Sequence, residues 1–180
     1  MALGLELGEK APDFKNLPAA DGKRYSLSSF ASSPILSVIF SCNHCPYVRA
    51  YEDRIIAIQR DYATKGVQLV AINSNDEIAY PDDSFEGMVM RAREKGFNFP
   101  YLRDEDQIVA DLYGPVCTPH VFVFDSERLF RYRGRIDDSK DPAKVTSHDL
   151  RNALDDLLAS KEVRVPDTKP FGCSIKWSVE

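Results

Sequence analysis

Apolar positions along the chain fall into short continuous runs and into stretches with a helical period. The runs at residues 35–40, 67–72 and 121–124 are rich in β-branched and aromatic side chains, and each predicts a buried strand. Between the first two runs, apolar residues recur at steps of three and four, which predicts a helix over residues 44–65. This strand–helix–strand order predicts two parallel strands joined by a right-handed crossover.

The rest of the chain predicts two hairpins, one more strand and three more helices. Asp21-Gly22 marks a turn between two short strands within residues 11–27, which predicts an N-terminal β-hairpin. The turn at residues 125–128 predicts a second, antiparallel hairpin, and residues 97–102 predict a short strand. The polar segment 73–83 is predicted to be a surface loop. Apolar periodicity and terminal signals predict further helices over residues 84–95, 106–113 and 147–160.

Together these elements predict an α/β fold in which a mixed central β-sheet is flanked by helices. A chain of 180 residues has the size of one domain. We expect this domain to occupy residues 1–162. Pro166 and Pro170 predict an extended C-terminal tail over residues 163–180, packed on the domain.

Charge and composition narrow the functional classes. A net charge of −5 argues against nucleic acid or an anionic membrane as the main partner. The first ten residues lack the basic and apolar regions of a secretory signal, so we expect a cytoplasmic protein. In that compartment, four cysteines are expected to serve catalysis or metal binding rather than structural disulfides.

The cysteine pair Cys42 and Cys45 lies where the first buried strand is expected to lead into the helix. Backbone N–H groups and the helix dipole at this end favour a thiolate, and the spacing allows a disulfide. We expect Cys42, nearer the helix tip, to be the exposed attacking thiol and Cys45, one turn in, to be the resolving thiol. Asn43 and His44 are expected to tune the pair, since an imidazole beside Cys42 lowers its pKa and makes the disulfide more oxidising.

Two other interpretations of this pair stay open. Cysteines at this spacing also occur as ordinary buried residues without a redox role. They occur in zinc sites as well, where His44, Cys117 and Cys173 could supply the remaining ligands. Zinc sites usually show a second close pair, whereas Cys117 and Cys173 stand alone in the sequence.

A second motif, Thr118-Pro119, precedes the buried run at residues 121–124. Together with Cys42-Asn43-His44-Cys45-Pro46 it resembles the thioredoxin superfamily, and more narrowly the alkyl-hydroperoxide-reductase/thiol-specific-antioxidant (redoxin) branch and its cytosolic thioredoxin-like proteins. The resemblance spans most of residues 8–160. It is supported by the segments 11–14, 21–27, 99–102, 121–125 and 132–137, and the segment 172–177 resembles a C-terminal signature of one subgroup.

The resemblance implies a thioredoxin-like fold and a thiol–disulfide oxidoreductase with antioxidant activity in cell redox homeostasis. It implies that Thr118-Pro119 is a cis peptide packed against the cysteine pair, with the Thr118 backbone free to hydrogen-bond an extended substrate. No cofactor is implied, and the partners would be protein or small-molecule disulfides and an electron donor. Ser41 stands where thioredoxins carry a tryptophan, and no residue matches their buried carboxylate.

Two rival functions follow from the same resemblance. Peroxiredoxins carry a Pro-x-x-x-Thr-x-x-Cys pattern, and here Val38 and Cys42 replace the proline and the threonine before Cys45. Arg135 is a candidate for the arginine that stabilises a peroxidatic thiolate. A thiol peroxidase acting on hydroperoxides is therefore one alternative, and a non-catalytic zinc- or protein-binding domain of the same fold is the other.

Cys117 and Cys173 admit three roles. If Pro119 contacts the cysteine pair, Cys117 should lie close to it as well. Cys117 is then a small buried residue, an acceptor of electrons from Cys45, or the partner of Cys173 in a disulfide that pins the tail. Trp177 is expected to anchor the same tail by packing.

Overall fold

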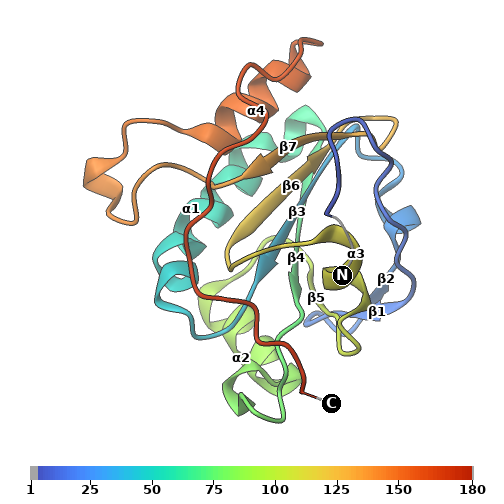
Figure 1. The fold of residues 1–180 in the computed structure, drawn as a ribbon, viewed down its shortest axis with the longest axis vertical. Helices are drawn as coiled ribbons and strands as arrows, with labels where there is room; N and C mark the ends of the chain where they lie inside the picture. The colour runs from blue at the N-terminus through green and yellow to red at the C-terminus, as the bar shows by residue number, and fades with distance from the viewer. Residues whose placement is uncertain (1–3, 180) are drawn as a thin grey trace.

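The computed structural model describes residues 4–179, which form a five-stranded sheet of order β5-β4-β3-β6-β7 and a separate two-stranded sheet, β1-β2 (Figure 1). The helices are α1 (Pro46–Tyr62), α2 (Phe85–Lys95), α3 (Ile108–Tyr113) and α4 (Asp149–Leu158). The strands are β1 (Leu17–Pro18), β2 (Arg24–Tyr25), β3 (Ile35–Ser41), β4 (Val67–Asn73), β5 (Tyr101–Arg103), β6 (His120–Phe124) and β7 (Phe130–Gly134).

The sheet is mixed, as predicted. Strands β3 and β4 are parallel, with Ser41 beside Asn73, and β5 continues the parallel part. Strand β6 is antiparallel to β3, with His120 beside Phe40, and forms the predicted hairpin with β7. The ends of β3, β4 and β5 and the start of β6 therefore meet at one edge of the sheet, which we call the dithiol edge.

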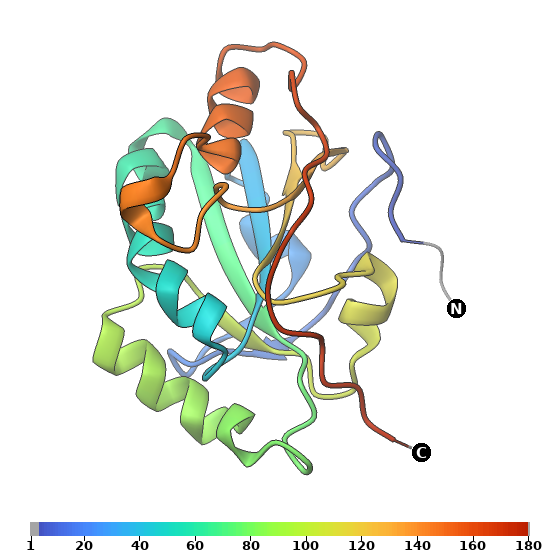
Figure 2. The same ribbon diagram turned by 60° about the vertical axis from the view of Figure 1, so that its left-hand side comes forward.

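Helices cover both faces of the sheet, as Figure 2 shows. Helices α1, α2 and α4 enclose one apolar core, while α3 and the N-terminal segment enclose the other. Every residue of β3 is buried, which explains why its sequence is a continuous apolar run rather than an alternating one. The predicted α/β class with a mixed sheet flanked by helices is confirmed.

The predicted hairpin within residues 11–27 is confirmed, with β1 at Leu17–Pro18 paired with β2 at Arg24–Tyr25. Two other predictions are wrong. Helix α1 begins at Pro46, two residues after the predicted start, because Cys45 has an extended backbone and forms the N-cap. The segment 73–83 is not a surface loop throughout, since Asn73, Ser74, Asn75 and Asp83 are buried.

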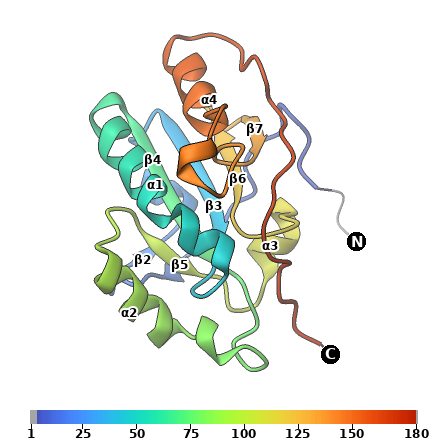
Figure 3. The same cartoon turned by 90° about the vertical axis from the view of Figure 1, so that its left-hand side faces the viewer.

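The chain ends in an extended segment, residues 166–178, which we call the strap (Figure 3). Its first part pairs with β7, where Arg133 N–H donates to Pro166 O and Thr168 N–H donates to Arg133 O, at 2.9 and 3.0 Å. Phe171 then packs on the rings of Tyr47 and Tyr51 of α1.

The expectation that Trp177 anchors this segment is wrong, because Trp177 is 46% exposed. The strap is held instead by backbone pairing and by Phe171. No helix among residues 4–179 is both long enough and apolar enough to span a membrane.

Candidate redox site

The cysteine pair lies at the dithiol edge, between β3 and α1. Cys42 follows the last residue of β3, and Cys45 is the N-cap of α1 with Pro46 at the first helical position. Cys42 is only 3% exposed and Cys45 only 2% exposed. The prediction of an exposed Cys42 and a Cys45 one turn inside the helix is therefore wrong, because it depended on a helix that began at residue 44.

Thr118 brings the second motif against both thiols. Its Oγ1 lies 3.4 Å from Cys42 Sγ, and its carbonyl oxygen lies 3.6 Å from Cys45 Sγ. The Thr118–Pro119 peptide bond is cis, as the resemblance implied. Cys42 and Cys45, 73 or more residues before Thr118 in the chain, thus share one compact site with the cis-proline loop.

The two thiols differ in acidity. The pKa of Cys45 is lowered, chiefly because the Cys42 thiol donates a hydrogen bond to its sulfur, and further because the Cys173 thiol and the Val48 N–H donate to it. The pKa of Cys42 is raised, first by that same donation to Cys45 and then by burial. The lowered pKa and the helix N-cap position favour Cys45 as the thiolate of the reduced pair, whereas the sequence suggested Cys42.

Asn43, between the two cysteines, fixes the loop that carries them. Its N–H donates to Asp83 Oδ1 over 2.8 Å, its amide donates to Asp82 O over 2.8 Å, and its amide oxygen accepts from the Tyr101 hydroxyl over 2.8 Å. His44 points outward, with its side chain 35% exposed and Nδ1 3.4 Å from Asp83 Oδ2. Asn43 thus positions the pair, and His44 borders it.

Asp83 is the residue of this site that the sequence did not reveal. It is fully buried and also accepts hydrogen bonds from the amides of Asn73 and Asn75, at 3.2 and 3.0 Å. Its charge raises the pKa of Cys42, although less than the hydrogen bond to Cys45 and burial do. The signal was an acidic and amide-rich stretch directly after a parallel strand, where polar side chains collect at the carboxyl edge of a sheet.

Cys117 and Cys173 lie on either side of the Thr118 backbone. Thr118 N–H donates to Cys173 O over 2.9 Å, and Cys173 N–H donates to Thr118 O over 3.3 Å, so the strap forms an antiparallel bridge there. The Thr118 backbone, expected to be free for substrate, is therefore occupied. Cys117 is buried, with its thiol 3.8 Å from Pro119 O and its pKa raised by burial to about 11.

All four cysteines are free thiols in this structure. Cys173 packs against the buried cluster formed by Cys42, Cys45 and Val48. Successive side chains of an extended chain alternate between its two faces, so Cys173, opposite Thr118, shares the face toward the dithiol, and Cys117 does not. This arrangement favours Cys45 over Cys117 as the partner of Cys173.

Two further predictions concern Arg135 and a zinc site. Arg135 donates through Nε to Asp149 Oδ2 over 2.7 Å, and its role in stabilising a peroxidatic thiolate stays a prediction. Within residues 4–179, no group of three or more His, Cys, Asp and Glu side chains is placed to hold a metal ion. The structure therefore offers no ligand set for the zinc interpretation.

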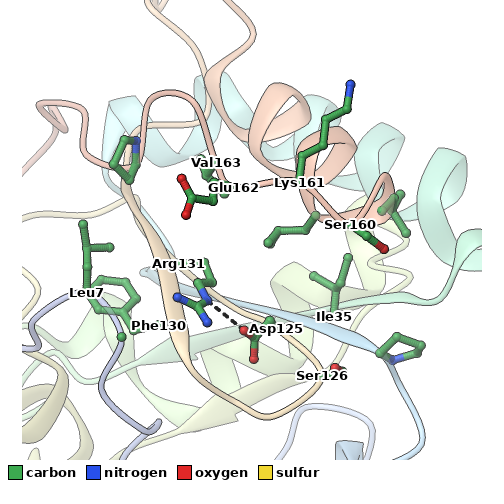
Figure 4. A pocket seen from close by; sticks show the side chains of 15 residues that line it. Leu7, Ile35, Asp125, Ser126, Phe130, Arg131, Ser160, Lys161, Glu162 and Val163 are labelled. Carbon is green, nitrogen blue, oxygen red and sulfur yellow. Dashed lines mark hydrogen bonds and ion pairs between the residues drawn. The ribbon is translucent and has the colours of Figure 1, made fainter.

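A groove of about 710 Å³ lies at the opposite end of β3 (Figure 4). It is lined by Ile35, by the Asp125–Arg131 ion pair and by residues that follow α4. Ile35 and Ser41 are the two ends of β3, so the groove is roughly 20 Å from the dithiol edge. None of its lining residues is a cysteine.

Comparison with models of protein families shows to which family this chain belongs. The model of the redoxin family matches residues 6–154. The chain belongs to the redoxin family. A comparison with curated proteins gave no match.

Solved structures agree with this assignment. This redoxin is 42% identical to an uncharacterized conserved protein from Geobacillus kaustophilus, with a TM-score of 0.91 over 97% of this chain and 94% of that chain. It is 40% identical to a hypothetical protein from Sinorhizobium meliloti 1021, with a TM-score of 0.89 over 99% and 98% of the two chains. A protein provisionally named as the thiol:disulfide interchange protein DsbE, from Chlorobium tepidum, is 25% identical with a TM-score of 0.62 over 72% and 85%.

The redoxin assignment and these structures establish the thioredoxin-like fold. They support a thiol redox function for this chain.

Proposed function

We propose that this redoxin is a thiol–disulfide oxidoreductase that exchanges a Cys42–Cys45 dithiol with substrate disulfides. One observation carries the proposal: a thiol with a lowered pKa, Cys45, caps a helix beside a second thiol and a cis-proline loop. A thiolate is the attacking species in disulfide exchange, and a neighbouring thiol is needed to complete it.

In the first step, Cys45 Sγ attacks one sulfur of the substrate disulfide. The substrate S–S bond breaks, one substrate thiolate leaves, and a mixed disulfide to Cys45 remains. The largest cause of the raised pKa of Cys42 is its hydrogen bond to the Cys45 thiolate, and this cause disappears once Cys45 is in a disulfide.

In the second step, Cys42 Sγ attacks Cys45 Sγ. Its proton passes to the departing substrate thiolate, and the products are the Cys42–Cys45 disulfide and a second substrate thiol. Thr118 Oγ1, at 3.4 Å, is in place to donate a hydrogen bond to Cys42 as it loses its proton. This order of attack reverses the one predicted from the sequence.

The cycle needs no cofactor, because both electrons reside in the two thiols, but it needs a donor that reduces the disulfide again. We propose a cytoplasmic setting, where such donors keep dithiols reduced. Among substrates we favour disulfides over hydroperoxides because Arg135 is engaged with Asp149.

Single-turnover reactions of the reduced protein test the proposal. A chromogenic aromatic disulfide should consume two thiols per chain rapidly, whereas hydrogen peroxide should consume them slowly. Cys45→Ser should lower the rate with the disulfide by about 100-fold or more, since it removes the thiolate. Cys117→Ser is the matched control and should react like the wild type. Rapid loss of thiols to peroxide but not to the disulfide would show a peroxidase instead.

A further inference from the structure

The strap covers the part of the dithiol edge where an extended substrate would dock. Both backbone groups of Thr118 are engaged by Cys173, as described above, and the contact is close. A Cβ atom added to Gly172 would lie 2.0 Å from Thr118 O, so only glycine fits at this position.

Beyond this bridge, the strap is held by further hydrogen bonds to the same edge. Asp76 N–H donates to Lys176 O over 2.8 Å, and Lys176 N–H donates to Asn75 Oδ1 over 2.9 Å. The amide of Gln107 donates to the same Lys176 oxygen, and Ser178 N–H donates back to Gln107 Oε1. The buried polar side chains after β4 and β5 thus hold a segment of the chain itself.

Within the strap, Cys173 is placed as a substrate cysteine would be. It packs against the cluster of Cys42, Cys45 and Val48, and it pairs with Thr118, whose carbonyl oxygen lies 3.6 Å from Cys45 Sγ. The pKa of Cys173 is raised to about 11, first by burial and then by its hydrogen bond to Cys45. Cys173 therefore stays a thiol while Cys45 carries the charge, and it is freed to lose its proton once Cys45 is in a disulfide.

We propose that Cys173 is a third redox cysteine, which exchanges with the Cys42–Cys45 disulfide to give a Cys45–Cys173 disulfide. This inference rests on the proposed function. Cys173 Sγ attacks Cys45 Sγ, the Cys45–Cys173 bond forms and the Cys42–Cys45 bond breaks. The electron pair of the broken bond stays on Cys42 Sγ, which takes up the proton that Cys173 loses. No net oxidation occurs, so no further oxidant is needed.

This exchange makes the access of a substrate to Thr118 depend on the redox state of Cys45 and Cys173. When Cys45 is bonded to Cys173, the strap is covalently locked over Thr118 and excludes an extended substrate. When both are reduced, only the backbone bridge and side-chain contacts hold the strap, and a polypeptide with a cysteine in extended conformation competes for the same positions. The strap thus acts as an internal substrate of its own active site.

Trapping the linkage in a Cys42→Ser chain tests this inference. With Cys42 absent, the mixed disulfide formed at Cys45 by the chromogenic reagent should be resolved by Cys173. Peptide mapping without reduction should then join the peptide that holds Cys45 to the one that holds Cys173. A Cys42→Ser/Cys117→Ser chain should form the same link, and a Cys42→Ser/Cys173→Ser chain should stay arrested with the reagent on Cys45.

A second variant tests the geometry without removing a sulfur. Gly172→Ala in the Cys42→Ser background should slow this resolution at least about tenfold, because a shift of about 1 Å at reacting groups is enough to lose that much rate. The matched control is Gly4→Ala, where the added Cβ would meet only an Arg133 nitrogen at 4.0 Å.

The outcomes separate the two proposals. If the wild-type chain does not react with the reagent at all, the proposed function fails. If the wild type closes its Cys42–Cys45 disulfide but the Cys42→Ser chain stays arrested, or links Cys45 to Cys117, the role of Cys173 is overturned and the proposed function stands.

Discussion

The two ends of β3 differ, because one borders a large groove and the other carries the reactive thiols. At the Ile35 end lies a groove of about 710 Å³, lined by apolar and polar residues that include an ion pair whose side chains are 42% and 20% exposed. At the Ser41 end, buried polar groups and thiols are packed together and covered by the strap.

This difference shows what marks the site. A cavity requires only that side chains leave space, whereas a buried carboxylate, amides and two hydrogen-bonded thiols are costly to keep away from water unless each has a partner. The dithiol edge is therefore the specialised end, although it has the smaller opening. It follows that a substrate gains access only when the strap moves.

Replacing the buried carboxylate should produce the largest change in stability. Asp83→Ala leaves the Asn43 N–H and the amides of Asn73 and Asn75 without their acceptor. We expect the free energy of unfolding to fall by about 4 kcal/mol, since each unsatisfied buried group costs about 1–3 kcal/mol. Urea denaturation of the reduced protein measures it. A loss below about 1 kcal/mol would mean that this network does not hold the dithiol loop.

Protonation of a buried histidine should give the next effect. Burial lowers the pKa of His120 from 6.5 to about 4, and its Nδ1 accepts from Val116 N–H over 3.1 Å. A lowered pKa in the folded state gives stability that is complete above pH 6.5 and is lost as the pH falls toward 4. The free energy of unfolding should fall by about 3 kcal/mol in total, since each unit by which the pKa is lowered corresponds to about 1.4 kcal/mol. His120→Asn, which keeps an acceptor for Val116, should remove most of it in denaturation curves at pH 4.5 and 7; an unchanged difference would show that His120 is not the group responsible.

The acidity of Cys45 predicts a flat rate profile with pH. An ordinary thiol loses about tenfold in thiolate for each pH unit below its pKa, but the lowered pKa of Cys45 preserves its thiolate. Iodoacetamide should therefore modify the fastest thiol at nearly the same rate at pH 8 and pH 6. At pH 6 Cys45→Ser should lower this rate by about 100-fold, whereas a tenfold fall per pH unit in the wild type would contradict the assigned charge.

The groove end should give the smallest effect. Arg131→Ala removes an ion pair with Asp125 whose two side chains are part-exposed. Such pairs contribute about 0–1 kcal/mol, so the free energy of unfolding should change by less than about 1 kcal/mol. The rate with the chromogenic disulfide should not change. A slower reaction would connect the groove to the redox chemistry and remove the contrast between the two ends.

Much of the fold could be predicted from sequence because local patterns determine it. The apolar runs predicted β3, β4 and β6, the helical period predicted α1, and the order of these elements predicted the parallel pairing of β3 with β4. The motif pair Cys42–Cys45 and Thr118-Pro119 identified the site, because both lie at elements that this topology brings together.

The features that the sequence did not predict depend on contacts between distant segments of the chain. The bridge between Thr118 and Cys173 and the burial of Asp83 join residues far apart in the chain, and no local pattern encodes either. The choice between the two thiols turned on a two-residue error in the start of α1. Helix boundaries are the least certain part of a sequence pattern, and here the boundary decides which sulfur is the N-cap.

A redox titration tests the central claim most directly. The protein is equilibrated with mixtures of reduced and oxidised dithiothreitol, free thiols are blocked with an alkylating reagent, and each cysteine is assigned by mass spectrometry. We predict that two thiols per chain disappear in one transition, that Cys45 is always one of them, and that Cys117→Ser leaves the transition unchanged. A Cys45 that is still fully alkylated in the oxidised protein would contradict the account.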